Sequence, residues 1–209
     1  MSFKKNKYVV VKKVIKKELA SFLYNYLLVK RQVARTLIDT KYISPFEKMF
    51  GVFGDGQVPK AFAAYADIAM ETLLIKAQPV VEKITGLKLL PNYSYTRIYG
   101  YGDELVKHID RFSCEISTTI NLGGEPWPIY VEPVGKTKEV KIDLKPGDML
   151  VYRGDLLQHW RKHFDGENHA QVFLHYNNAK KKESNIYDER IHLGLVKDPM
   201  FLQKKEKND

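Results

Sequence analysis

Residues 104–110, Glu-Leu-Val-Lys-His-Ile-Asp, belong to a series of short segments rich in β-branched and aromatic residues that predicts the fold. The other segments are YSYTRIY at 93–99, CEISTTINL at 114–122, PIYVEP at 128–133, EVKIDL at 139–144, DMLVYRG at 148–154 and AQVFLHY at 170–176. Gly, Pro and Asp residues separate them, as in GYGD and KPGD. Six or seven short strands with no helical pattern between them indicate an antiparallel sandwich or barrel.

The residues before this series are patterned as helices. Apolar side chains recur three or four positions apart from Ile15 to about Leu37, as one buried helix face requires. A second helical pattern opens at Pro59, a favoured first-turn residue; Pro79 should kink or split it, and Gly86 is its expected end. The stretch GVFGDGQVP between the two lacks the Gly-Lys-Ser/Thr ending of a phosphate-binding loop, so we expect a mobile loop there.

The chain of 209 residues is long enough for one domain of class α+β. We expect residues 1–90 to be mainly helical support with the mobile loop, 91–178 to form the strand-rich core, and 179–209 to be a basic C-terminal extension. No apolar run reaches the roughly 18 to 20 residues that span a bilayer, and no signal-peptide pattern is present. The single cysteine, Cys114, excludes an internal disulfide and favours a reducing compartment, so we expect a cytoplasmic protein.

The net charge of +9 comes from lysines that cluster at both ends of the chain. They are Lys4, Lys5, Lys7, Lys12, Lys13, Lys16 and Lys17 at the front and Lys180, Lys181, Lys182, Lys204, Lys205 and Lys207 at the back. Such a surface could bind nucleic acid or another polyanion. Because no nucleic-acid motif accompanies the charge, and arginine is the stronger indicator of phosphate recognition, we interpret these lysines as a solvated surface.

His108 and Asp110 have the spacing of a metal chelate. Two residues apart on a predicted strand, they share one face of it. His159 follows a strand announced by the Pro146-Gly147-Asp148 turn and offers a second imidazole. Two histidines and one carboxylate are the ligand set of non-haem Fe(II) oxygenases, which leaves positions open for oxygen and a co-substrate. The alternative is that the histidines are ordinary polar residues near the rim of a barrel.

This pattern resembles the 2-oxoglutarate/Fe(II)-dependent dioxygenases, in particular their prolyl 4-hydroxylase-like branch. The matching residues are Arg97-Ile-Tyr-Gly-Tyr-Gly-Asp-Glu-Leu-Val-Lys-His108-Ile-Asp110, the Pro146-Gly147-Asp148 turn and His159, within residues 88–177. The resemblance implies a double-stranded β-helix (jelly-roll) core with N-terminal helices packed on one sheet. It also implies Fe(II) held by His108, Asp110 and His159, with 2-oxoglutarate and O₂ as co-substrates whose reaction is coupled to hydroxylation of a C–H bond.

The residue that binds the far carboxylate of 2-oxoglutarate is less evident. The resemblance places an Arg or Lys nine or ten residues after the distal histidine, where this chain has Asn168 and His169. Arg161 is the favoured replacement, because it shares a strand face with His159 and a guanidinium binds a carboxylate through two hydrogen bonds. The alternative reading of Arg161 is a surface residue on a loop.

Three further residues remain candidates for this carboxylate. His169 could bind it if protonated. Arg97 shares a strand face with Tyr99, which matches an inward tyrosine of the family. Arg111 should face away from the site unless its strand ends at Asp110.

Alternation along two strands predicts which side chains line the cavity. On the segment 114–122, Ser117, Thr119 and Asn121 share the more polar face and are expected next to the co-substrate. On the last strand, His169, Gln171, Phe173 and His175 should face the cavity, while Val172, Leu174 and Tyr176 should pack beneath the helices.

The leading hypothesis is therefore a dioxygenase that hydroxylates a small molecule, an amino acid or a peptidyl residue such as proline, with the loop at 52–57 as a lid. A nucleic-acid-modifying oxygenase of the same chemistry, which would use the lysines, is the second hypothesis. A non-catalytic jelly-roll binding module is the third, and the presence of all three metal ligands counts against it. The aromatic residues Trp127, Tyr130 and Trp160 are expected at the core or the rim.

Overall fold

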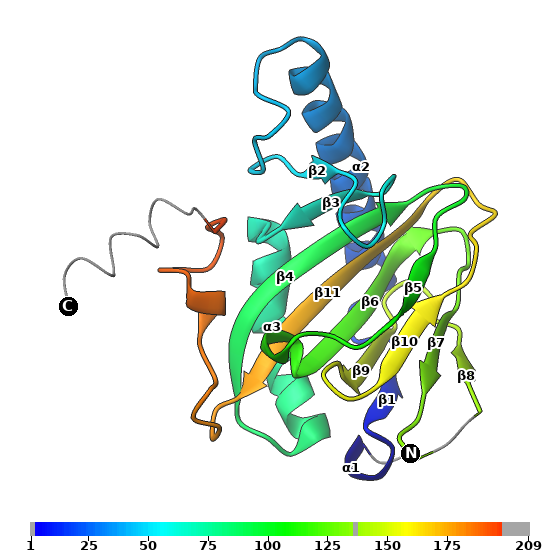
Figure 1. The fold of residues 1–209 in the computed structure, drawn as a ribbon, viewed down its shortest axis with the longest axis vertical. Coiled ribbons are helices and arrows are strands. Elements are labelled where there is room, and N and C mark those ends of the chain that lie inside the picture. Colours follow the sequence, from blue (N-terminus) through cyan, green and yellow to red (C-terminus); the bar gives the residue numbers. More distant parts are fainter. Residues whose placement is uncertain (1–2, 136–137, 198–209) are drawn as a thin grey trace.

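The computed structural model describes residues 3–135 and 138–197, which form two facing antiparallel sheets (Figure 1). The helices are α1 (Phe3–Asn6), α2 (Lys17–Asp39), α3 (Ile68–Thr85) and the short 3₁₀ helices η1 (Phe112–Cys114) and η2 (Tyr187–Glu189). The strands are β1 (Tyr8–Val11), β2 (Val52–Phe53), β3 (Phe62–Tyr65), β4 (Leu89–Tyr99), β5 (Leu105–His108), β6 (Ile116–Gly124), β7 (Ile129–Glu132), β8 (Val140–Ile142), β9 (Met149–Arg153), β10 (Gln158–Arg161) and β11 (His169–Asn178).

The larger sheet has seven strands in the order β1-β9-β6-β11-β4-β3-β2, and the smaller sheet has four in the order β5-β10-β7-β8. Neighbouring strands are antiparallel in both sheets. From β4 to β11 the chain passes repeatedly from one sheet to the other, as in a jelly roll, and only β7 and β8 are consecutive strands of one sheet. The prediction of an α+β jelly-roll with helices on one sheet is confirmed.

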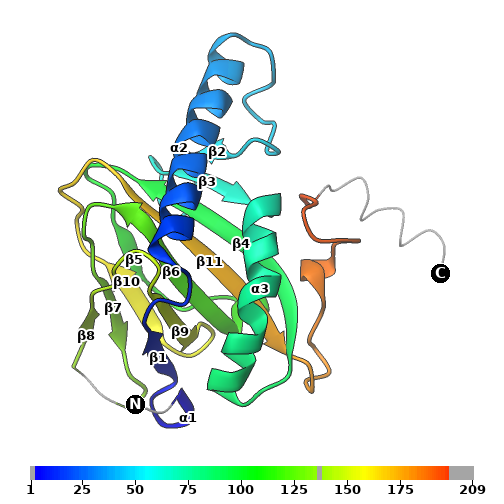
Figure 2. The ribbon, with the colours of Figure 1, turned by 180° about the vertical axis from the view of Figure 1, so that it is seen from behind.

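Helices α2 and α3 cover the outer face of the larger sheet, as Figure 2 shows from behind. Leu23 and Leu27 of α2 and Leu74 of α3 are buried in one cluster with Val172 and Leu174 of β11. Burial of each such side chain stabilises the fold by roughly 1.5 to 3 kcal/mol. The predicted alternation along β11 is confirmed, and its opposite face is left free to line the space between the sheets.

The second helix begins at Ile68, so the prediction that it begins at Pro59 is wrong. Residues Phe62–Tyr65 form β3 instead and pair with β4. The helix starts where the side chain of Asp67 accepts hydrogen bonds from the backbone amides of Ala69 and Met70. It continues through Pro79 without being divided, and it ends as predicted at Gly86, which adopts φ 72°.

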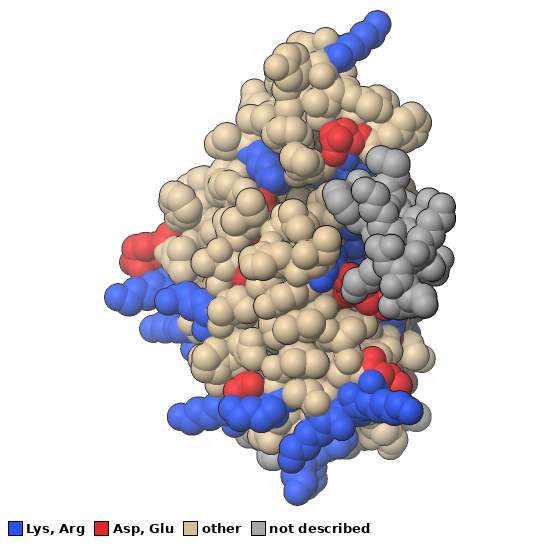
Figure 3. Space-filling model, turned by 90° about the vertical axis from the view of Figure 1, so that its left-hand side faces the viewer, with Lys and Arg blue, Asp and Glu red and all other residues tan. Residues whose placement is uncertain are grey.

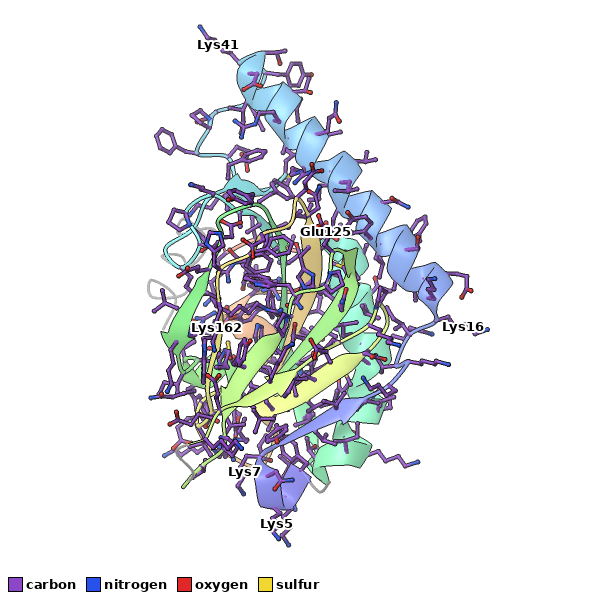
Figure 4. All side chains as sticks on the ribbon, turned by 90° about the vertical axis from the view of Figure 1, so that its right-hand side faces the viewer. Lys5, Lys7, Lys16, Lys41, Glu125 and Lys162 are labelled. Carbon is purple, nitrogen blue, oxygen red and sulfur yellow. The ribbon has the colours of Figure 1, made fainter. Side chains whose placement is uncertain are left out.

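The N-terminal 90 residues contribute strands as well as helices. Strand β1 extends one edge of the larger sheet, and β3 with β2 extends the other. Helix α2 reaches beyond the sheet between Lys16 and Lys41, the labelled residues at its two ends in Figure 4.

The C-terminal segment is fastened to the domain as far as it is described, to residue 197. Arg190 is buried, and its Nη2 lies 2.7 Å from Glu71 on α3 and 2.8 Å from the carbonyl of Asn92 on β4. Asp188 is also buried and accepts a hydrogen bond of 2.8 Å from the Tyr65 hydroxyl on β3. Lys204, Lys205 and Lys207 lie outside the described residues.

Basic side chains gather at the margins of the molecule. On the face in Figure 3, Lys and Arg are concentrated at the lower end, while most of the centre is uncharged. Lys5 and Lys16 point away from the sheets in Figure 4. Within the described part of the chain, none of the helices combines the length and the apolar character needed to cross a membrane.

Candidate metal centre and co-substrate site

His108, Asp110 and His159 meet between the two sheets. His108 ends β5 and pairs directly with His159 on β10. Asp110 lies in the turn after β5, where its amide donates a hydrogen bond of 2.8 Å to the carbonyl of Gly154. Its Oδ1 atom is 3.5 Å from Nε2 of His108 and 3.6 Å from Nε2 of His159. Three donor atoms of the kinds that hold Fe(II) thus face one point.

Both imidazole rings are oriented by their own strands. Nδ1 of His108 lies 2.7 Å from the carbonyl of Val106, and Nδ1 of His159 lies 3.0 Å from the carbonyl of Leu157. A ring nitrogen facing a carbonyl must carry the proton, so Nε2 of each ring presents a lone pair to the shared point. This is the arrangement by which proteins fix histidine ligands for a metal.

The carboxylate of Asp110 is closely enclosed by neighbouring residues. Its Oδ2 accepts a hydrogen bond of 2.9 Å from the Ser117 hydroxyl on β6, which leaves Oδ1 for the metal. A Cβ atom at Gly154 would lie only 2.4 Å from Oδ2, so this position requires glycine. Burial alone would raise the pKa of Asp110, but His108 and His159, when protonated in the metal-free site, stabilise the carboxylate and lower its pKa to about 2. The group is therefore an anion at neutral pH.

A second group of donors, Asp110, Cys114 and His175, also has its ligand atoms within 4.8 Å of one another. Cys114 would have to be a thiolate to bind a metal, and burial raises its pKa to about 12. Its Sγ is 3.0 Å from the Tyr93 hydroxyl, and Nδ1 of His175 is 3.0 Å from the Ser117 hydroxyl. These residues form a hydrogen-bonded wall behind Asp110 and do not constitute a second metal site.

A pocket of about 430 Å³ opens onto the three ligands. Its other lining residues are Asp55, Gly56 and Gln57 of the glycine-rich loop, and Tyr93, Tyr95, Arg97, Leu105, Ile109, Arg111, Cys114, Tyr152, Phe173 and His175. The predicted loop therefore forms part of the pocket wall. Of the four residues of β11 predicted to face the cavity, Phe173 and His175 line the pocket, whereas His169 and Gln171 do not.

Arg161 is a buried cation without a matching anion among the described residues. Its side chain is 2% exposed, Nη1 donates to the carbonyl of Trp127, and the guanidinium lies 4.9 Å from the centre of the Trp127 indole. Nε and Nη2 have no hydrogen-bond partner, and neither has the buried hydroxyl of Tyr99. Burial lowers the pKa of Arg161 to about 10. A carboxylate, such as that of 2-oxoglutarate, would satisfy these donors. Neither Arg161 nor Tyr99 is among the residues that line the pocket at the metal ligands, so the carboxylate would have to reach them beyond its wall.

The charge of Arg97 is already matched. Its Nε and Nη2 donate to Oδ2 of Asp55 at 2.8 and 2.6 Å, and Nη2 also reaches Gln57 at 2.7 Å. Tyr95 donates to the same carboxylate at 2.7 Å. Arg97 therefore holds the glycine-rich loop against β4.

His169 is neutral, because burial and the nearby charge of Arg161 lower its pKa to about 3. Its Nδ1 donates to the carbonyl of Glu125 at 2.7 Å, and its Nε2 lies 3.0 Å from the amide of Gln171, to which Thr119 donates at 2.8 Å. Asn121 donates to the carbonyl of Leu144 at 2.7 Å. Thr119, Asn121 and His169 are thus engaged in internal hydrogen bonds rather than in lining the pocket.

Several residues of the pocket were not singled out by the sequence. Asp55, Tyr93, Tyr95 and Cys114 are distant in the chain and carry no motif. Arg111 lines the pocket because β5 ends at His108, before Asp110. On the sequence alone, Arg111 should face away from the site only if the strand continues past Asp110. Of the three aromatics, Trp127 packs at Arg161, whereas Tyr130 and Trp160 stack on each other at 5.8 Å and do not line the pocket.

No protein-family model and no curated protein matches this sequence. Solved structures do match. A prolyl-4-hydroxylase from Pseudomonas putida has a TM-score of 0.58 at 12% identity, over 84% of this chain and 95% of that one. The α-ketoglutarate-dependent epimerase SnoN of nogalamycin biosynthesis has a TM-score of 0.63 at 15% identity, over 94% and 93%. EctD from S. alaskensis, with bound Fe, has a TM-score of 0.59 at 16% identity, over 96% and 80%. The chain therefore has the fold of the non-haem, 2-oxoglutarate-dependent iron oxygenases.

Proposed function

We propose that this protein is an Fe(II)- and 2-oxoglutarate-dependent dioxygenase that hydroxylates a small molecule, an amino acid or a peptidyl residue. One observation carries the proposal: a fully buried arginine with free donors lies two residues along β10 from a metal-ligand histidine. An unmatched buried cation is costly, so its presence beside a His-Asp-His cluster needs an anionic ligand. A structural role alone gives no reason to keep it.

His108, Asp110 and His159 would hold the iron, and Arg161 with the Tyr99 hydroxyl would hold the far carboxylate of 2-oxoglutarate. Bound iron would supply, with 2-oxoglutarate and O₂, the oxidising power for hydroxylation of a C–H bond. The protein contributes position. Ser117 and Gly154 fix the carboxylate of Asp110, and the carbonyls of Val106 and Leu157 fix the two rings. The apolar side chains of Leu105 and Phe173 exclude water from the wall nearest the ligands.

The glycine-rich loop would act as the lid of the pocket. Asp55 joins it to Arg97 and Tyr95 on β4, and Gly56 and Gln57 line the pocket beside the metal ligands. Gly54 adopts φ 83°, and a Cβ there would lie 2.3 Å from the carbonyl of Pro59, so the shape of the loop depends on this residue. A pocket of about 430 Å³ suits a small molecule or one side chain of a peptide.

Anaerobic addition of Fe(II) and then 2-oxoglutarate tests the proposal. The wild type should develop the visible metal-to-ligand charge-transfer band of an iron and 2-oxoglutarate complex, and Asp110→Ala should not, because it removes the only carboxylate of the cluster. His163→Gln, at an exposed histidine outside the pocket, is the matched control and should keep the band. Absence of the band in the wild type, with no succinate released over amino acids, prolyl peptides and oligonucleotides, would refute the enzymatic function. The panel also separates the small-molecule, peptide and nucleic-acid readings.

A further inference from the structure

Arg111 lies where the active-site pocket meets a second pocket of about 430 Å³. The two pockets share Arg111, Asp55 and Tyr95 as lining residues. The second pocket is otherwise lined by Lys48, Gly51, Val52, Gly54, Ala63, Tyr65, Asp188, Val196 and Lys197. The two pockets therefore adjoin at these three residues.

A stack of rings connects Arg111 to the metal ligands. Its guanidinium lies 5.1 Å from the centre of the Tyr93 ring, and that ring is 4.6 Å from the imidazole of His175. His175 in turn lies 3.0 Å from the Ser117 hydroxyl that donates to Asp110. Arg111 is thus separated by the Tyr93 ring from His175 in the wall behind Asp110.

Arg111 retains free hydrogen-bonding capacity. Its side chain is 54% exposed, and its one side-chain hydrogen bond within the described residues runs from Nη2 to Oδ2 of Asp188, at 3.0 Å. The same Oδ2 accepts a bond of 2.8 Å from the Tyr65 hydroxyl and lies 3.3 Å from Nζ of Lys197. Lys197 also lies 3.5 Å from Oε2 of the exposed Glu189, so two carboxylates, Asp188 and Glu189, face Arg111 and Lys197.

Two further charged residues line the second pocket. The carboxylate of Asp55 is committed to Arg97, and Lys48 adds a further positive charge to the second pocket. In the proposed enzyme, the charge of Fe(II) and of Arg161 would be balanced by Asp110 and the two carboxylates of 2-oxoglutarate. The net positive charge of the second pocket then rests on Lys48.

We propose that the substrate carries an anionic group, a carboxylate or a phosphate, which Arg111 and Lys197 bind at the junction of the two pockets. The identity of this ligand as a substrate rests on the proposed oxygenase function, whereas its binding does not. A guanidinium with unused donors and an adjacent ammonium form strong, charge-assisted hydrogen bonds with oxyanions. Asp188 holds Arg111 in place through the hydrogen bond from Nη2.

The test uses metal-free full-length protein and two probes, inorganic phosphate and acetate, followed through the arginine Nε–Hε signals in NMR titrations. The wild type should show a saturable shift of the Arg111 signal, and a stronger response to one probe identifies the anion class. Arg111→Gln and, independently, Lys197→Gln should weaken binding by about tenfold each, the loss of one charge-assisted contact. Lys141→Gln, at an exposed lysine of β8, is the control and should bind as the wild type does.

Three results would overturn the proposal. One is the absence of a saturable shift at Arg111, and another is unchanged affinity in both Arg111→Gln and Lys197→Gln. The third is loss of binding in Arg161→Gln alone, which would place the anion at the co-substrate position. Because none of these measurements needs iron or turnover, their failure is distinct from a failure of the charge-transfer test of the enzyme.

Discussion

Replacement of Arg161 by methionine should make the ligand-free protein more stable and abolish its response to 2-oxoglutarate. Methionine keeps an unbranched side chain of similar length and removes the charge. In the folded protein this charge is fully buried, and no described carboxylate pairs with it. Arg161 lowers the stability of the ligand-free protein, and it is also the residue that we propose to bind the co-substrate. Its replacement should therefore raise the stability of the ligand-free protein and remove the stabilisation by 2-oxoglutarate.

The magnitude follows from the pKa of Arg161. Burial lowers it from 12.5 to about 10, and at about 1.36 kcal/mol for each pKa unit the charged form costs the folded protein about 3 kcal/mol at neutral pH. The hydrogen bond to the carbonyl of Trp127, which the variant loses, offsets about 1 to 2 kcal/mol of this cost. A net gain of about 1 to 2 kcal/mol raises the unfolding temperature of a protein of this size by about 3 to 6 °C.

Thermal unfolding with a redox-inert divalent ion, with and without 2-oxoglutarate, measures both effects. The wild type should unfold at a higher temperature when 2-oxoglutarate is added, since a ligand of the native state stabilises it. Arg161→Met should start higher and not respond, because truncating one partner of a buried charge pair costs about 2 to 5 kcal/mol of affinity. Arg153→Met, which removes an arginine paired with Asp155 at 2.7 Å, should gain no stability. A less stable Arg161→Met that still responds to 2-oxoglutarate would refute this reasoning.

Three further predictions concern the surroundings of the metal. Ser117→Ala should weaken Co(II) binding about tenfold, because the carboxylate of Asp110 loses the hydrogen bond that positions it. Ser117→Thr keeps a hydroxyl and should bind Co(II) as the wild type does. Equal Co(II) affinities of Ser117→Ala and the wild type in a titration would show that Ser117 does not position Asp110. Burial lowers the pKa values of His169 and His175 to about 3 and 4, so below pH 6.5 only the unfolded chain takes up protons at these residues. As the pH falls from 6.5 to about 4, each of them should lower the free energy of unfolding by about 1.4 kcal/mol per pH unit. In urea unfolding His175→Gln should remove its share of that slope, and an unchanged slope would show that His175 is protonated in the folded protein. Asp55→Asn should loosen the loop at 52–57, seen as faster proteolysis there and as 2-oxoglutarate oxidation without hydroxylation; a protease-resistant loop would contradict the latch to Arg97.

The strand-rich core could be predicted because alternation is a local property. Each strand from β4 to β11 carries its own pattern of apolar and polar side chains, and the pattern of β11 places Val172 beneath the helices and His175 toward the pocket. The clustering of His108 with His159 required more, since it depends on β5 pairing with β10 across 50 residues of chain. In the sequence, two features supported this clustering: the presence of residue types that bind Fe(II), and the Pro146-Gly147-Asp148 turn before β9. The separation of the two histidines along the chain did not support it.

Features that depend on partners distant in the chain could not be predicted. Phe62 and Tyr65 have a spacing that suits a helix, and only pairing with β4 makes them a strand. Arg97 was a candidate for the co-substrate because nothing in the sequence shows that Asp55, 42 residues earlier, occupies its guanidinium. The extension after Asn178 has no regular spacing of hydrophobic residues from which its packing could be predicted. Two buried charged residues, Asp188 and Arg190, attach it to the domain instead.

A cation at position 169, where the resemblance to the dioxygenases led us to expect one, would lie beside Arg161. His159 and Arg161 are two residues apart, about 6.6 Å on a strand, and both face the space between the sheets. The charge of Arg161 contributes to lowering the pKa of His169, so the two groups lie close enough to interact. A lysine at position 169 would bring a second buried cation beside the first, with no described carboxylate to separate them. A neutral histidine, hydrogen-bonded to Glu125 and Gln171, fills the same place without repulsion. A cation at one of these two positions therefore disfavours a cation at the other.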